Sequence, residues 1–177
     1  MKHTIFNVLN RTSSILDCIT EQTGKIASWL VLFLVIIVSY DVTMRYIFQS
    51  GSIAIQELEW HVFSLIFLLG SAYTLKHDDH VRLDLLYQSK FMNDNRRAWV
   101  NFLGCLFFLI PFCILVIVSS WQFIHLSFIH NEGSPDPGGL SYRWIIKSAI
   151  PLSFTLLLLQ GISYLIKSLS YIMDNKS

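Results

Sequence analysis

The sequence predicts an all-α integral membrane protein with four transmembrane helices. Apolar residues make up 53% of the 177 residues and charged residues only 14%, well below the roughly 25% charged residues of soluble domains. Four stretches with few or no charges each reach the about 20 residues that a helix needs to cross a bilayer. The remaining sequence is too short for a soluble enzyme domain. The net charge of +1 provides no basic field for nucleic acid.

The N-terminal segment, over about residues 4–20, is expected to form an amphipathic helix on the inner membrane surface. Apolar residues recur there at spacings of three and four between Ile5 and Ile19, while Lys2, Arg11 and Asp17 occupy other faces. This pattern is typical of a helix at the headgroup boundary, and a frayed tail is the alternative. The segment lacks the apolar core of a signal peptide, so the first span is expected to target the chain to the membrane.

The four spans are predicted over about residues 25–47, 57–75, 98–121 and 147–168, within a single domain of residues 1–177. Five tryptophans fall near the ends of these spans, at the level that indole rings favour: Trp29, Trp60, Trp99, Trp121 and Trp144. Cys105 and Cys113 lie inside the third span and are interpreted as buried thiols. The chain shows no internal repeat of the kind from which many secondary transporters are built.

The distribution of lysine and arginine predicts the orientation. Ten of these residues fall in the N-terminal segment, the middle loop and the C-terminal end, whereas the other two loops hold only Arg45, Arg143 and Lys147. Positive residues remain cytoplasmic during insertion. Both termini are therefore expected inside, with the first and third loops facing the periplasm from the bacterial inner membrane.

A first polar cluster lies at the outer ends of spans one and two. Asp41 and Arg45 are four residues apart and share a helix face, and Glu57, Glu59 and His61 open the next span at the same level. Charges near a membrane core are costly unless they are paired. We interpret Asp41, Arg45, Glu57 and Glu59 as a network that holds these spans to each other or to a partner; a transport or catalytic site is the alternative.

A second cluster follows span two at the inner surface and contains His80, Arg82 and Asp84. We interpret it as a solvated junction that caps the span. A metal site is the alternative, because His77 and His80 could share a helix face, but the spacing places no third ligand. No metal is therefore predicted.

The third cluster is the outer loop over residues 132–140, which contains two prolines and three glycines and is predicted to be a constrained turn. Basic and aromatic residues follow it at the start of span four. Together they predict an outer docking surface, although such residues also serve as ordinary interfacial anchors. The surface comprises Pro135, Gly138, Gly139, Arg143, Trp144 and Lys147.

Four short motifs, taken in order, resemble the small membrane subunit of TRAP (tripartite ATP-independent periplasmic) transporters, the DctQ-like family. They are Asp41-Val42-Thr43-Met44-Arg45-Tyr46, Glu57-Leu58-Glu59-Trp60, His80-Val81-Arg82-Leu83-Asp84, and Gly139-Leu140-Ser141-Tyr142-Arg143-Trp144 leading into Ile150-Pro151. Leu83 stands where the family usually has valine. The resemblance covers nearly the whole chain.

The resemblance implies a scaffold subunit that is not an enzyme and carries no cofactor. Its partners would be a large multi-span membrane subunit, which binds and moves the substrate, and a soluble periplasmic binding protein, which delivers an organic acid. An ion gradient, usually of sodium, would drive this symport. Arg82 and Asp84 would hold the inner junction.

Two other functions remain open at this point. The first is a haem b-bearing membrane anchor of a redox enzyme, which would use His61 and His125 near the outer side. The second is a small transporter or channel that acts alone. It is disfavoured because no set of polar residues lines a path through the middle of the membrane.

Overall fold

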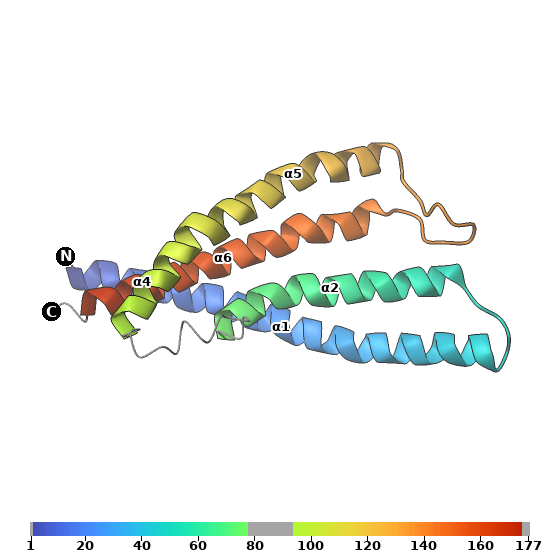
Figure 1. The fold of residues 1–177 in the computed structure, drawn as a ribbon, viewed down its shortest axis with the longest axis horizontal. Coiled ribbons are helices and arrows are strands. Elements are labelled where there is room, and N and C mark those ends of the chain that lie inside the picture. The colour runs from blue at the N-terminus through green and yellow to red at the C-terminus, as the bar shows by residue number, and fades with distance from the viewer. Residues whose placement is uncertain (1, 78–93, 175–177) are drawn as a thin grey trace.

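The chain is helical throughout the part that the structure describes, apart from its connecting loops. The computed structural model describes residues 2–77 and 94–174. The helices are α1 (Lys2–Tyr46), α2 (Ile53–His77), α4 (Asp94–Gly104), the π-helical turn η1 (Cys105–Leu109), α5 (Ile110–Ile129) and α6 (Trp144–Asp174). Because α4, η1 and α5 follow one another without a gap, the elements form four long rods (Figure 1).

Each rod contains a segment long and apolar enough to cross a membrane, as the sequence predicts. These segments are Arg11–Tyr46, Ile53–His77, Arg97–Ile129 and Trp144–Ile172. They overlap all four predicted spans and extend beyond most of their ends. Extra length is accommodated by helix tilt.

The helix predicted over residues 4–20 is present, but it is not separated from the first span, because α1 continues without a break from Lys2 to Tyr46. No proline interrupts this stretch, and Gly24 is its only glycine. Gly24 is buried and faces the ring of Tyr73 on α2, whose Cγ would lie 2.6 Å from an added Cβ. The glycine therefore permits close packing of two helices instead of ending one.

The π-helical turn has a local cause in the proline that follows it. Pro111 has no N–H and cannot donate to the carbonyl one turn earlier. The N–H of Ile110 instead bonds to the carbonyl of Cys105, five residues back, which is the π-helical pattern. Pro151 is also tolerated within a helix, since α6 continues through it.

The four rods lie side by side in the order α1, α2, α6 and α5 (Figure 1). Both described ends of the chain, near residues 2 and 174, lie at one end of the row, which we call the terminal end. The loops over residues 47–52 and 130–143 lie at the other, the loop end. The first half of α1 also packs against α6 at the terminal end. The rods therefore form an open row towards the loop end.

Small residues line the contacts between the helices, and large apolar side chains point outwards. Cys113, Ser120 and Ser127 are buried on α5 at seven-residue intervals, and Ser13, Thr20 and Ala27 repeat this spacing on α1. Cys105 is buried as well, so both thiols expected to be buried are confirmed. Small residues allow close packing in membranes, where lipid removes the usual hydrophobic drive between helices. The outer faces are thus left for lipid or for partner subunits.

Candidate functional site

The loop end gathers most of the residues that the sequence marks as functional, but it divides the first polar cluster in two. Glu57 and Glu59 are two residues apart on α2 and so point in directions about 200° apart around its axis. Glu57 contacts the loop over residues 130–143. Glu59 lies within electrostatic reach of Asp41 and Arg45 of α1. Each carboxylate therefore belongs to a different helix contact.

Glu57 fixes the loop over residues 130–143 to the start of α2. Its carboxylate accepts hydrogen bonds from the Ser134 hydroxyl and from the Leu140 backbone N–H, the latter at 2.6 Å. Gly139 passes so close that an added Cβ would lie 2.8 Å from Glu57 Oε2, and Gly138 adopts a φ of 87° that favours glycine. The two glycines are needed to seat the turn on Glu57.

Asp41, Arg45 and Glu59 form the second group, between α1 and α2. Asp41 and Arg45 are paired along α1, with side chains 4% and 46% exposed. Among the described residues, neither Asp41 Oδ1 nor Glu59 Oε1 has a hydrogen-bond partner, although both atoms are buried. A buried carboxylate oxygen without a donor is costly. This contact is therefore electrostatically incomplete in the isolated chain.

Trp144 and Lys147, expected on the outer docking surface, pack between α5 and α6. Lys147 pairs with Glu132, and its ammonium lies 3.9 Å from the ring centre of Phe123. Trp144 meets Phe128 edge to face, with ring centroids 5.4 Å apart. The hydrogen bond from Lys147 holds the pKa of the Glu132 carboxyl below its usual value. These side chains hold the loop over residues 130–143 against the two helices that it connects, α5 and α6.

The more exposed part of the predicted docking surface surrounds a hollow of about 220 Å³ at the loop end. Pro135 and Gly138 are exposed, and Arg143 is half-buried. The hollow is lined by both helix and loop: Ile53, Gln56, Glu57, Trp60, His61, Pro135, Asp136 and Arg143. His61, one of the two histidines considered for haem, faces this hollow, while His125 is exposed on α5.

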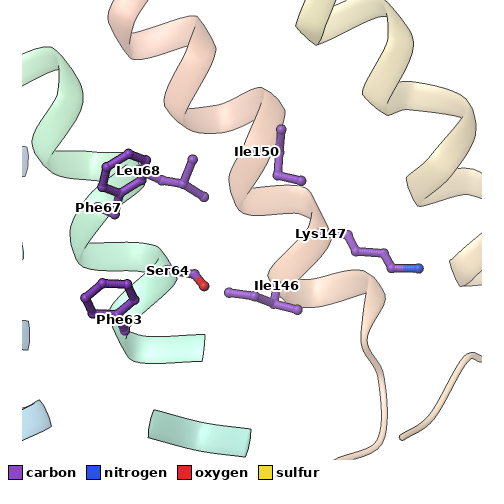
Figure 2. Close-up of a pocket in the computed structure, with 7 residues that line it drawn as sticks. All are labelled: Phe63, Ser64, Phe67, Leu68, Ile146, Lys147 and Ile150. Carbon is purple, nitrogen blue, oxygen red and sulfur yellow. The ribbon is translucent and has the colours of Figure 1, made fainter. Parts of the chain in front are cut away.

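α2 also carries an aromatic stripe, formed by Trp60, Phe63 and Phe67, which are 77%, 62% and 72% exposed. A hollow flanks it on each side. Towards α1, a hollow of about 440 Å³ is lined by Leu34, Val38 and Glu59. Towards α6, Figure 2 shows a groove of about 380 Å³ in which Ser64 and Leu68 point to α6, while Lys147 points away from α2. The stripe is thus a ridge between two largely apolar grooves.

Sequence reasoning missed a polar network between α1 and α6 at the terminal end. Thr20 donates to Gln160 Oε1 at 2.6 Å, Gln160 Nε2 donates to Asp17 at 3.1 Å, and Ser163 donates to Asp17 at 2.8 Å. Lys167 pairs with Asp17, and the hydroxyls of Ser13 and Ser163 lie 2.7 Å apart. The spacings 13, 17, 20 and 160, 163, 167 place each set on one helix face, a signal that the apolar stripe concealed.

A second ion pair joins α1 to α2 near the same end. Lys76 donates to Glu21 at 2.5 Å, and His77 Nε2 lies 3.3 Å from the same carboxylate oxygen. The next predicted cluster, with His80, Arg82 and Asp84, lies outside the described residues. No group of three or more potential metal ligands occurs within residues 2–77 and 94–174.

Comparison with known families decides which of the proposed identities applies. A family model described as "Tripartite ATP-independent periplasmic transporters, DctQ component" matches residues 34–170, which is most of the chain. The chain belongs to the DctQ family. The predicted family is therefore confirmed, and the haem-anchor and stand-alone alternatives give way to it. No curated protein shows a significant sequence match.

Membership settles the class of function. A DctQ component is a multi-pass inner-membrane subunit of a TRAP transporter, is not an enzyme, and associates with the other TRAP subunits. The match begins at Leu34 and so includes the aromatic stripe and the Glu57-bound loop, but it excludes the α1 half of the α1–α6 polar network.

Proposed function

We propose that this DctQ component is a scaffold that presents the loop-end half of α1 and α2 to the large membrane subunit. The observation that supports this most strongly is the pair of buried carboxylate oxygens, on Asp41 and Glu59, that lack donors. Lipid tails offer no hydrogen bonds, so a lipid-facing position would leave the cost of these atoms unrelieved. A protein partner can cover the half-exposed Arg45 beside Asp41 and exclude this contact from lipid.

The openness of the row supports the same assignment. Only 6% of the most apolar window of α2 is buried within the chain, against 28% for α6. The aromatic stripe of α2 therefore lacks a covering in this chain, and aromatic residues of this kind are typical anchors of subunit interfaces. Glu59 joins the incomplete polar contact to the groove beside the stripe. Both features fit one continuous partner surface.

A double substitution tests this assignment. Phe63→Ala with Phe67→Ala removes two large exposed rings from the stripe, and we expect recovery of the large subunit in a mild-detergent pull-down to fall about tenfold or more. Phe107→Ala with Phe108→Ala is the matched control, because those rings are 64% and 79% exposed on the α4–α5 rod. If the control lost the partner and the test variant kept it, the proposed face would be wrong.

We further propose that the loop over residues 130–143 helps to dock the periplasmic binding protein. This rests on the predicted orientation, with both termini in the cytoplasm, and on the anchoring of the loop by Glu57. Pro135, Asp136 and Gly138 are exposed on the anchored turn. The organic acid expected as substrate would be recognised by the other two components.

A binding measurement tests the docking role. Surface plasmon resonance with the assembled membrane complex should show weaker capture of the binding protein when Asp136→Lys reverses the charge at the exposed turn. Asp94→Lys at the terminal end is the control and should leave capture unchanged. Equal capture by both variants and the unaltered complex would contradict the docking role of this turn.

A further inference from the structure

α4 crosses α6 at the terminal end (Figure 1), and a separate pocket is lined by residues of both helices. Its volume is about 380 Å³. α4 contributes Arg97 and Asn101, together with Ala98, and α6 contributes Tyr164, Lys167, Ser168 and Tyr171. Residues three and four apart on a helix point the same way, so each helix presents one polar face to the pocket.

The lining is basic and rich in hydrogen-bond donors. Among the described residues, the lining includes one guanidinium and one ammonium group, three hydroxyls and one amide, and no carboxylate. Lys167 also pairs with Asp17. However, its side chain is 52% exposed, and an ammonium carries three donors, so it can bond a second anion. Arg97 also makes an interaction of its own, but a guanidinium has five N–H donors, and arginine binds phosphate through two parallel hydrogen bonds. The cationic groups and hydrogen-bond donors of the lining are therefore suited to binding a phosphate group.

The surroundings indicate that this phosphate belongs to a lipid. The third span is predicted to begin at about residue 98 and the fourth to end at about residue 168, so the pocket lies at the predicted level where headgroups meet the apolar layer. Val100 and Leu103 do not line the pocket but lie on other faces of α4, where they are 49% and 44% exposed, so acyl chains can run along that side of the helix. A free anion would make no use of these side chains.

We propose that this pocket binds the phosphate of an anionic glycerophospholipid. Arg97 and Lys167 hold the phosphate, the neighbouring hydroxyls and Asn101 orient the headgroup, and the acyl chains run along the exposed apolar side of α4. Basic pockets between transmembrane helices bind anionic headgroups in this way. The inference rests on the placement of the chain in a membrane and is independent of the scaffold role.

Native mass spectrometry of the full chain in mild detergent tests the proposal, with titration of phosphatidylglycerol or phosphatidylcholine. We expect one tightly retained phosphatidylglycerol, and two nearby cations predict about tenfold or more preference over phosphatidylcholine. Arg97→Gln and Lys167→Gln should each remove most of this preference. Lys25→Gln, at an exposed cation on α1 outside the pocket, should retain it.

Two further measurements separate the possible explanations. Circular dichroism checks that each variant keeps its helices. Lys167→Gln also breaks the pair with Asp17, so if Lys167→Gln unfolds, the result is decided by Arg97→Gln. Inorganic phosphate at millimolar concentration should not displace the lipid. Displacement by phosphate would overturn the lipid assignment, and unchanged preference in Arg97→Gln would overturn the site.

Discussion

The α1–α6 contact at the terminal end and the α1–α2 contact at the loop end differ in how completely their polar groups are hydrogen-bonded. At the terminal end, Asp17 and Gln160 lie between α1 and α6, and their side chains satisfy one another and their neighbours. At the loop end, Asp41 and Glu59 lie between α1 and α2, and each keeps a buried oxygen without a donor among the described residues. Because unsatisfied buried groups are costly, the first contact stabilises the chain itself, whereas the second is suited to completion by a partner.

The two regions also differ in how much apolar surface they bury. α6, which contacts α1, α2, α4 and α5, has the largest buried share among the four candidate spans. α2 has the smallest, and the three rings of its aromatic stripe are 62–77% exposed. One region thus holds the fold, and the other offers surface to a second subunit.

The largest expected effect comes from breaking the terminal-end network. Gln160→Leu removes the bonds to Thr20 and Asp17 and leaves both groups without that partner in a buried contact. We expect the free energy of unfolding in detergent to fall by about 2 kcal/mol. Ser39→Ala is the control, because Ser39 is exposed and its hydroxyl donates to the carbonyl of Val35 on its own helix. Similar stability of both variants would contradict a stabilising role for the network.

A smaller effect is expected at the loop end. Glu57→Ala removes the acceptor for Ser134 and Leu140 and should cost about 1 kcal/mol, confined to the loop. Hydrogen–deuterium exchange over residues 132–143 should rise several-fold, while exchange in α1 and α6 stays unchanged. Global acceleration of exchange would instead show that Glu57 supports the entire fold.

The smallest effect concerns pH. The pKa of Glu132 is lowered in the folded chain, chiefly by its hydrogen bond from Lys147. A carboxyl with a lowered folded pKa contributes stability above its unfolded pKa, and this contribution is lost as pH falls through the folded pKa. As the pH is lowered from 5, the melting temperature of the unaltered chain should therefore fall slightly more than the melting temperature of Glu132→Gln. If the melting temperatures of the two proteins fell equally with pH, the pair of Glu132 and Lys147 would not contribute to the acid sensitivity of the fold.

Much of the fold could be predicted from sequence because span length and low charge follow directly from the bilayer as solvent. The order of the rods could not, since the buried stripes consist of small residues such as Ser120 and Cys113 that carry little hydrophobic signal. The continuity of α1 was also not predicted, because Asp17 was placed on a face away from the apolar stripe, whereas its carboxylate accepts a hydrogen bond from Gln160.

The site was predictable in composition but not in grouping. The sequence marks Asp41, Arg45, Glu57 and Glu59 by charge alone, and only the helix rotation between Glu57 and Glu59 separates the loop anchor from the α1–α2 contact. From the sequence, Lys147 is likewise expected to be an exposed anchor, whereas in the structure it pairs with Glu132 and lies between α5 and α6. Such pairings depend on tertiary contacts that spacing cannot specify.

Site-specific photo-crosslinking in native membranes tests the central claim most directly. A photoreactive phenylalanine analogue would replace Phe63 on α2 in one sample and Phe108 on the α4–α5 rod in another. If the loop-end half of α1 and α2 meets the large membrane subunit, position 63 crosslinks to that subunit and position 108 crosslinks mainly to lipid. Crosslinking of the large subunit from position 108, with only lipid captured at position 63, would contradict the account.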